Sequence, residues 1–292
     1  MKLDDSFFLQ NVLDIPPRIT LRLSGLLTVL LVIVSWGYLL ASADPGSLAV
    51  FSGKNLGSAA DFLAQLLGEG VDDPAFLNTA AWREALRLTL DTLKMSLLAI
   101  GFAVGGMLLT VLLGARTSAD GALTLSDGPG GTIAFLLIRW SYVLARGIPE
   151  LFWAMFLLFV FTPGILPGAL ALAVHNYGIL GKLCSEIIED MDVRPIRSLR
   201  SSGASLGQIL FYGVLPAVTP QFLTYGLYRW EEIIRTTIVV GFVSAGGLGR
   251  EFKLSMNWFH HTEVTLYLIC YFLLVVFVDL LSGGLRTLAK LE

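Results

Sequence analysis

Long apolar stretches separated by short polar ones run through most of this sequence. A helix needs roughly 20 apolar residues to cross the ~30 Å hydrocarbon layer of a membrane. Runs of this kind occur at residues 21–40, 89–113, 132–161, 167–188, 215–243 and 264–284. The pattern therefore predicts an all-α integral membrane protein with six transmembrane helices.

The composition supports this prediction. Of the 292 residues, 55% are hydrophobic and 15% are charged, and the mean hydropathy is +0.73. A soluble globular domain carries about 25% charged residues. Because the apolar runs take up most of the chain, we expect one membrane domain and no room for a soluble enzymatic domain.

The segments between the runs suggest how the chain is organised. The stretch DSFFLQNVLDI, which ends before Pro16 and Pro17, is amphipathic and is expected to lie along a membrane surface. The expected parts are an amphipathic N-terminal segment at 1–20, a first transmembrane helix at 21–41, an external segment at 42–84, a core of five transmembrane helices at 85–285 and a tail at 286–292.

The distribution of charge predicts how the chain is oriented. Basic residues lie beside the first run, after the fourth and after the last, at Lys2, Arg18, Arg22, Arg194, Arg197, Arg200, Arg286 and Lys290. The segment 43–82 instead carries mostly acidic residues. By the positive-inside rule, both termini and the loop at 190–212 are expected to be cytoplasmic, and the segment 42–84 periplasmic.

Proline and cysteine positions add two local predictions. The third run contains Arg146-Gly-Ile-Pro149, and a proline there removes a backbone hydrogen bond and should kink or break the helix. Cys184 and Cys270 both fall within apolar runs, where we expect two small buried side chains and no disulfide.

Several kinds of chemistry are missing from the sequence. There is no G-x-x-x-x-G-K-[ST] motif, because Gly181-Lys182 is followed by Leu183, so the chain is not expected to hydrolyse nucleotide. No group of Cys and His residues has the spacing of metal ligands. We therefore expect no catalytic residues, no metal and no cofactor in this chain, and no nucleic acid partner.

A polar loop follows the fourth apolar run. The sequence is strongly polar from Asp190 to Ser202, Gly203 permits a tight turn, and Leu215-Pro216 begins the next run. Residue chemistry alone thus predicts a short helix, a glycine turn and a second helix that enters the membrane.

Charged residues interrupt the fifth run at Arg229, Glu231, Glu232 and Arg235. A charge at mid-membrane costs ~2.5–3.5 kcal/mol on insertion scales, so these groups should be paired or face water. Their spacing predicts pairs on one helical face between Arg229 and Glu232, Glu232 and Arg235, and Glu231 and Arg235.

Two interpretations of this charged strip remain open. It is a salt-bridge ladder that braces helices, or the lining of a pathway in which arginines meet an oxyanion, and the two interpretations are compatible. Tyr228 would belong to the same pathway, and His175 in the fourth run is either a pathway residue or an interior histidine.

Three glycines near the end of the fifth run predict irregular backbone. Gly246, Gly247 and Gly249 cannot comfortably continue a regular helix. At membrane depth such backbone is tolerated only inside protein or beside a water-filled cavity. In a symmetric dimer these glycines are expected to form a gate near the outer end of the pathway.

Several motifs, in order along residues 82–285, resemble the permease subunits of phosphonate-type ABC importers. They are RGIPELFWAMFL (146–157), ALALAVHNYGILGKLCSEIIE (169–189), GASLGQILFYGVLP (203–216), TYGLYRWE (224–231) and GFVSAGGLG (241–249). In particular, Gly203, Leu215 and Pro216 match the signature EAA-x3-G-x9-I-x-LP of the cytoplasmic coupling loop. Where the family usually has Glu-Ala, this chain has Arg197-Ser198, which reverses the charge of that contact.

The resemblance implies a type I ABC importer permease fold with a cytoplasmic coupling helix. It implies that the loop contacts a separate ATPase through Arg194, Arg197, Ser198, Leu199, Gly203, Ala204, Leu215 and Pro216. The implied assembly in the bacterial inner membrane is a homodimer with two ATPase subunits, which bind ATP and Mg, and a periplasmic substrate-binding protein.

The implied substrates are phosphonates or related phosphorus oxyanions. Phosphite, hypophosphite and phosphate are alternatives within the same architecture. An ion-coupled secondary anion transporter is the alternative of another class, since it would also explain arginines and glutamates inside the membrane.

Overall fold

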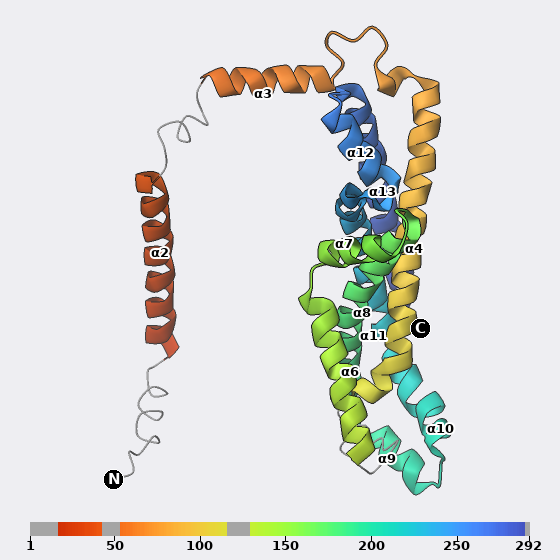
Figure 1. The fold of residues 1–292 in the computed structure, drawn as a ribbon. Coiled ribbons are helices and arrows are strands. Elements are labelled where there is room, and N and C mark those ends of the chain that lie inside the picture. Colours follow the sequence, from red (N-terminus) through yellow and green to blue (C-terminus); the bar gives the residue numbers. More distant parts are fainter. Residues whose placement is uncertain (1–16, 43–52, 116–128, 290–292) are drawn as a thin grey trace. The chain divides into compact units, whose positions relative to one another are not determined.

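The computed structural model describes residues 17–42, 53–115 and 129–289 (Figure 1), and every regular element within these ranges is a helix. The chain divides into two units, residues 1–64 and residues 65–292. Most of the predicted N-terminal segment, up to residue 16, lies outside the described residues, as do residues 290–292 of the predicted tail.

The first unit contains α2 (Pro17–Ser42) and most of α3 (Gly53–Leu66). The stretch Leu23–Ser42 of α2 is long and apolar enough to cross a membrane. It coincides closely with the first transmembrane helix predicted at 21–41.

The second unit contains the remaining helices. These are η2 (Ala75–Leu77), α4 (Thr79–Gly114), α6 (Pro129–Gly147), α7 (Glu150–Val160), α8 (Ile165–Asp190), α9 (Arg194–Ser201), α10 (Leu206–Gln208), the π-helix η3 (Ile209–Val214), α11 (Leu215–Val240), the π-helix η4 (Gly241–Ala245), α12 (Gly247–Asn257) and α13 (His261–Ala289). α4 begins at Thr79, which lies within the segment 42–84 predicted to be external.

In the described part of the chain, four helical stretches are individually long and apolar enough to span a membrane: Leu23–Ser42, Thr79–Gly114, Leu206–Val243 and His261–Leu288. α6 and α7 meet the same standard as a pair. α8 is 26 residues long but is not among these stretches. The total of six spans therefore stays a prediction.

The break between α6 and α7 confirms the kink predicted at Arg146–Pro149. The two helices are bent by 97°, and Pro149 stands immediately before α7. Proline cannot donate a backbone hydrogen bond to the preceding turn, so the helix stops and restarts in a new direction. In Figure 1, α7 runs across the direction of α6 and α8.

α8 lies at the centre of the second unit, and its contact with α4 is the most extensive between any two helices. Small residues allow this close approach. The Tyr142 ring of α6 lies over Gly181, and a Cβ added to Gly178 would lie only 2.7 Å from the Tyr142 carbonyl oxygen. Small residues are typical of helix interfaces in membranes, where van der Waals contact is the main attraction between helices. Cys184 and Cys270 are buried and free, as predicted.

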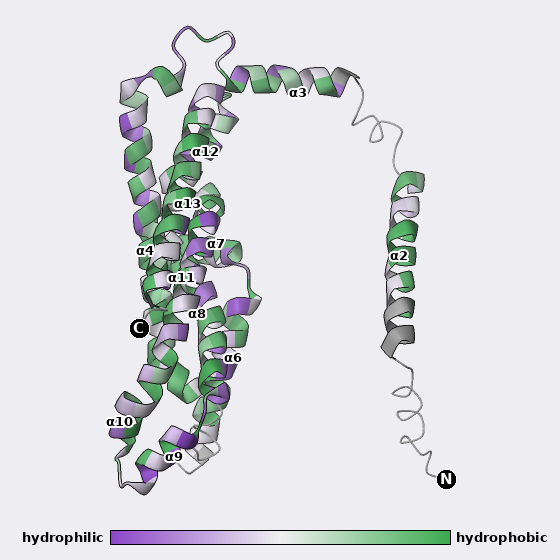
Figure 2. Cartoon of the chain, turned by 180° about the vertical axis from the view of Figure 1, so that it is seen from behind, coloured by the Kyte–Doolittle hydropathy of each residue, from purple (hydrophilic) through white to green (hydrophobic). Residues whose placement is uncertain are grey.

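The two ends of the second unit have different compositions. α9 and α10 lie at one end and α12 at the other (Figure 1). Figure 2 shows the long helices as mostly hydrophobic, whereas hydrophilic residues gather on α9. At the end that carries α12, Asn78 caps the N-terminus of α4, because its side chain accepts hydrogen bonds from the backbone amides of Ala80 and Ala81.

Candidate functional site

The loop between α8 and α11 contains a short helix, a glycine turn and a second short helix. α9 ends at Ser201, and Gly203 has a φ of +81°, which a residue with a Cβ rarely adopts. Ser205 then begins α10 with a capping box, in which its side chain and that of Gln208 satisfy each other's backbone amides. This is the local path that the polar sequence predicted, and its contact with an ATPase stays a prediction.

One side of α9 is anchored and the other is exposed. Ile196 is 3% exposed and joins a hydrophobic cluster with Ile209 and Val214, and Leu199 contacts the same cluster. Such burial holds a short helix in place, since eight residues are too few to be stable as an isolated helix in water. Arg197 and Ser198 point to the exposed side.

The remaining residues predicted to couple to an ATPase have varied surroundings. Arg194 donates hydrogen bonds to Asp192 at 2.8 Å and 3.0 Å, and this pairing holds the pKa of the Asp192 carboxyl below its ordinary value. Ala204 and Leu215 are partly buried, and Pro216 is exposed in the first turn of α11.

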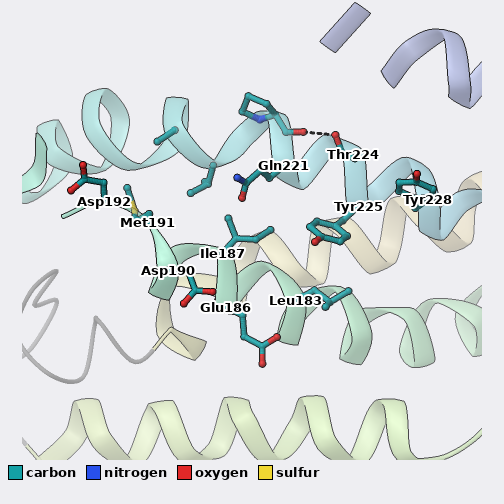
Figure 3. A pocket seen from close by; sticks show the side chains of 13 residues that line it. Leu183, Glu186, Ile187, Asp190, Met191, Asp192, Gln221, Thr224, Tyr225 and Tyr228 are labelled. Atoms are coloured by element: carbon teal, nitrogen blue, oxygen red, sulfur yellow. Dashed lines mark hydrogen bonds between the residues drawn. The ribbon is translucent and has the colours of Figure 1, made fainter. Parts of the chain in front are cut away.

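A groove of about 1060 Å³ lies between the second half of α8 and the first half of α11. Figure 3 shows Asp192 and Met191 at one end and Tyr228 at the other. Glu186 and Asp190 also line it, so the end nearest to α9 is rich in carboxylates. The groove thus leads from the α9 loop toward the charged part of α11.

One face of α11 is both polar and exposed. Gln221, Tyr225, Tyr228, Glu232 and Arg235 recur every three or four residues and are all exposed. We call these five residues the polar face of α11. Charged groups that faced lipid would be costly, so this face requires water or another protein surface.

The charged residues of α11 pair differently from the prediction. Glu231 does not pair with Arg235 but is 8% exposed and lies 2.6 Å from Arg286 of α13. The Arg286 guanidinium also lies 4.0 Å from the centre of the Tyr228 ring. Glu231 is therefore directed toward α13 and does not belong to the polar face.

Arg235 and Arg229 also have partners on other helices. Arg235 lies 3.0 Å from Asp279 of α13, and the predicted contact with Glu232 is present at 3.6 Å. Arg229, predicted to pair with Glu232, instead donates hydrogen bonds of 2.9 Å and 2.6 Å to Asn176 Oδ1 of α8. The charges therefore link α11 to α8 on one side and to α13 on the other.

His175 lies at the break between α6 and α7. Its Nδ1 is 2.9 Å from the carbonyl oxygen of Ile148, and its Nε2 is 3.4 Å from Glu150. Because a helix break leaves backbone carbonyls without partners, this contact satisfies one of them. The position agrees with an interior histidine, one of the two interpretations of this residue.

The predicted gate glycines lie where two backbone segments cross. Gly246 and Gly247 have positive φ angles of 90° and 67°, and a Cβ on Gly247 would lie 2.6 Å from Thr92 Oγ1. Gly249 packs against Gly241, where an added Cβ would lie 2.8 Å from Gly249 Cα. The irregular backbone expected here is present, and it is buried against protein.

Several residues of this region were not predicted from the sequence. Asn176, Glu150, Asp279 and Arg286 all contact its charged or polar groups. Asn176 and Asp279 are isolated polar residues in apolar runs, a signal that could have found them, whereas Arg286 was assigned to the tail. In the part of the chain that the structure describes, no group of three or more His, Cys, Asp or Glu residues is arranged to hold a metal ion.

Comparison with known proteins gives consistent results. Residues 129–288 match the family described as "Binding-protein-dependent transport system inner membrane component". The phosphite transport system permease protein PtxC of Stutzerimonas stutzeri is 35% identical over 224 residues, which are 77% of this chain and 76% of that protein. A protein of Escherichia coli (strain K12), provisionally named cryptic phosphonate transport system permease protein PhnE2, is 37% identical over 117 residues, 40% of this chain and 96% of that protein.

A solved structure supports the fold. The MetNI methionine ABC transporter, in an inward facing conformation, matches with a TM-score of 0.60 over 73% of this chain and 99% of that chain, at 17% identity. The family match covers more than half of the chain, from α6 to α13. The protein therefore belongs to the family of inner membrane components of binding-protein-dependent transport systems, with the fold of a type I ABC importer permease.

Proposed function

We propose that this chain is the membrane-spanning permease subunit of an ATP-driven importer for phosphonates or related phosphorus oxyanions. The observation that carries the proposal is the polar face of α11, which continues the groove that starts at the α9 loop. A transmembrane helix exposes such residues at low cost where they face another protein surface or a path that water or a polar solute occupies.

The substrate class follows from the relatives and from charge. PtxC is named for phosphite, and PhnE2 for phosphonate. Both are phosphorus oxyanions, which guanidinium groups bind through paired hydrogen bonds. Arg235 belongs to the polar face and Arg229 lies beside it, so cationic groups border the proposed path. Phosphite, hypophosphite and phosphate are the alternatives in the same architecture.

Transport energy would come from a partner, because the sequence has no phosphate-binding loop of its own. In this proposal two ATPase subunits bind ATP and Mg, and each docks on one copy of the loop at 190–212. The exposed side of α9 supplies the contact, with Arg197 and Ser198 at its centre. Since Arg197 replaces the family glutamate, the partner surface should offer a carboxylate or a helix C-terminus at that point.

The proposed assembly is a homodimer in the bacterial inner membrane, with both termini in the cytoplasm. The polar faces of two copies would together enclose the path. A periplasmic substrate-binding protein would deliver substrate at the end of the unit that carries α12, opposite the α9 loop (Figure 1). Gly246 immediately precedes α12, Gly247 and Gly249 lie in its first turn, and these three glycines are proposed as the outer gate.

Uptake into proteoliposomes tests this function. The chain is co-expressed with the ATPase and the binding protein of its own organism, and uptake of radiolabelled phosphite and methylphosphonate is measured with and without ATP. We expect uptake that requires ATP, the ATPase and the binding protein. Uptake by the chain alone, driven by a proton or sodium gradient, would contradict the proposal and identify an ion-coupled secondary transporter.

A further inference from the structure

The arginines that link helices in the second unit differ in the charge of their partners. Arg235 pairs with Asp279, Arg286 with Glu231 and Arg139 with Glu189, so each of these three lies beside a carboxylate. Arg229 instead donates its hydrogen bonds to the side-chain oxygen of Asn176. An amide accepts a hydrogen bond without cancelling the charge of the guanidinium.

The contact with Asn176 holds the Arg229 guanidinium in one orientation. Nε and Nη2 both donate to the same oxygen, at 2.9 Å and 2.6 Å, and Asn176 is only 2% exposed. Asn176 is itself fixed, because its Nδ2 donates to the carbonyl oxygen of Leu172 at 2.7 Å. A guanidinium has five N–H groups, so this arrangement leaves others for the oxygens of an anion.

The Arg229–Asn176 contact lies beyond the end of the groove that is farther from the α9 loop. Tyr228 on α11 and Leu183 on α8 are at that end (Figure 3). Arg229 follows Tyr228, and Asn176 precedes Leu183 by seven residues, about two turns or roughly 10 Å along the same face of α8. A solute that passes between the groove and the other end of the unit would therefore pass near Arg229.

The charges along this route change from positive to negative. Asn176 makes the hydrogen bonds to Arg229, while Glu150 lies beside His175 and Glu232 beside Arg235. Further along, Glu186, Asp190 and Asp192 line the groove toward the α9 loop. An anion would thus be attracted at one point and repelled afterwards, which allows it to leave.

We propose that Arg229 is the cation that a phosphorus oxyanion contacts midway through the permease, and that Asn176 is a positioning residue which holds Arg229 without neutralising it. This inference rests on the proposed function and adds the site at which the anion is recognised. Asn176 has this role because a carboxylate at the same place would form an ion pair that competes with the substrate.

The substitution Asn176→Asp tests the inference, because aspartate has nearly the same shape but adds a negative charge and removes the donor to the Leu172 carbonyl oxygen. The ion pair with Arg229 should offset that lost hydrogen bond, so the thermal unfolding temperature of the complex should stay close to that of the wild type. Phosphite uptake by proteoliposomes containing the full complex should nevertheless fall by about tenfold, which corresponds to about 1.4 kcal/mol. Asn55→Asp, the same change at an exposed position of α3 in the first unit, is the matched control and should leave uptake unchanged.

Asn176→Ala provides the opposite case. This substitution removes the hydrogen-bond partner of the Arg229 guanidinium but leaves the guanidinium charge in place. The Asn176→Ala complex should therefore be less stable than the Asn176→Asp complex and yet take up phosphite faster than that complex. If Asn176 only braced helices, the less stable of the two variants would also show the lower phosphite uptake. That order, or wild-type uptake in Asn176→Asp, would overturn the inference while leaving the proposed function intact. A wild-type complex that takes up neither phosphite nor methylphosphonate would overturn both.

Discussion

At the scale of single residues, adjacent charges on α11 have opposite surroundings. Glu231 is buried beside Arg286, whereas the Glu232 side chain is 49% exposed and lies near Arg235. Arg235 keeps Asp279 as a second partner. Two neighbouring glutamates are thus expected to respond differently to the same substitution.

Glu231→Gln should destabilise the subunit by roughly 3 kcal/mol, because it leaves Arg286 in a largely buried position without a counter-charge. Glu232→Gln is the matched control and should change stability little, since Arg235 still pairs with Asp279. Cys184 and Cys270 are buried, so their reaction with a thiol dye during heating reports unfolding. Equal shifts in the two variants would show that Glu231 and Arg286 do not form a structural pair.

At the scale of elements, glycines set how closely helices approach. A Cβ on Gly178 of α8 would lie 2.6 Å from the Arg146 amide nitrogen and 2.7 Å from the Tyr142 carbonyl oxygen, both in the backbone of α6. A Cβ on Gly101 of α4 would meet nothing within 4 Å. The backbone of α6 cannot move aside as a flexible side chain could.

Gly178→Ala should therefore separate α6 from α8 and cost about 1–3 kcal/mol, the range for overpacking. Gly101→Ala should be neutral or slightly stabilising, because alanine is the better helix former. Thermal unfolding of both purified variants checks this. A Gly178→Ala protein as stable as the wild type would mean that the α6–α8 contact adjusts freely.

In the turn after α9, the backbone conformation at Gly203, and not the space around it, limits which residues the position tolerates. Gly203 has a φ of +81°, and a Cβ there would meet nothing within 4 Å. Gly203→Leu should cost roughly 1–2 kcal/mol in that conformation. We expect normal amounts of protein in the membrane and reduced co-purification of the ATPase, as the α9 surface is displaced.

Gly203→Asn is the control for this prediction. Asparagine adopts left-handed conformations more readily than leucine does, so the ATPase should remain associated. If Gly203→Leu retains its ATPase and transports normally, the loop at 190–212 is not the coupling contact.

At the scale of the whole molecule, the polar face of α11 predicts a dimer. Two copies that turn this face toward each other would remove its charged and polar groups from lipid. Gln221 lies on that face, and Leu109 of α4, which is 83% exposed, belongs to an apolar surface suited to lipid.

Gln221→Cys should therefore form covalent dimers with a flexible bis-maleimide in membranes, whereas Leu109→Cys should not. The native cysteines do not interfere, because Cys184 is 0% and Cys270 3% exposed. The products are separated by denaturing gel electrophoresis. Dimers from Leu109→Cys alone would place the interface on α4 and contradict the proposed path along α11.

Features that depend on neighbours along the chain can be predicted from the sequence alone. Apolar runs predicted α4, α8, α11 and α13 because spanning a membrane requires a minimum apolar length. Pro149 predicted the break after α6 because proline cannot donate a backbone hydrogen bond. Gly203 predicted the turn after α9, where a positive φ is required.

Which side chains meet across helices depends instead on how the helices pack in three dimensions. Helical spacing predicted pairs within α11, yet Glu231 contacts Arg286 and Arg229 contacts Asn176. These residues are separated by many positions, and their contact depends on how α8, α11 and α13 are rotated against one another. That rotation follows from small residues, helix breaks and the summed packing of the whole unit, which no local pattern in the sequence contains.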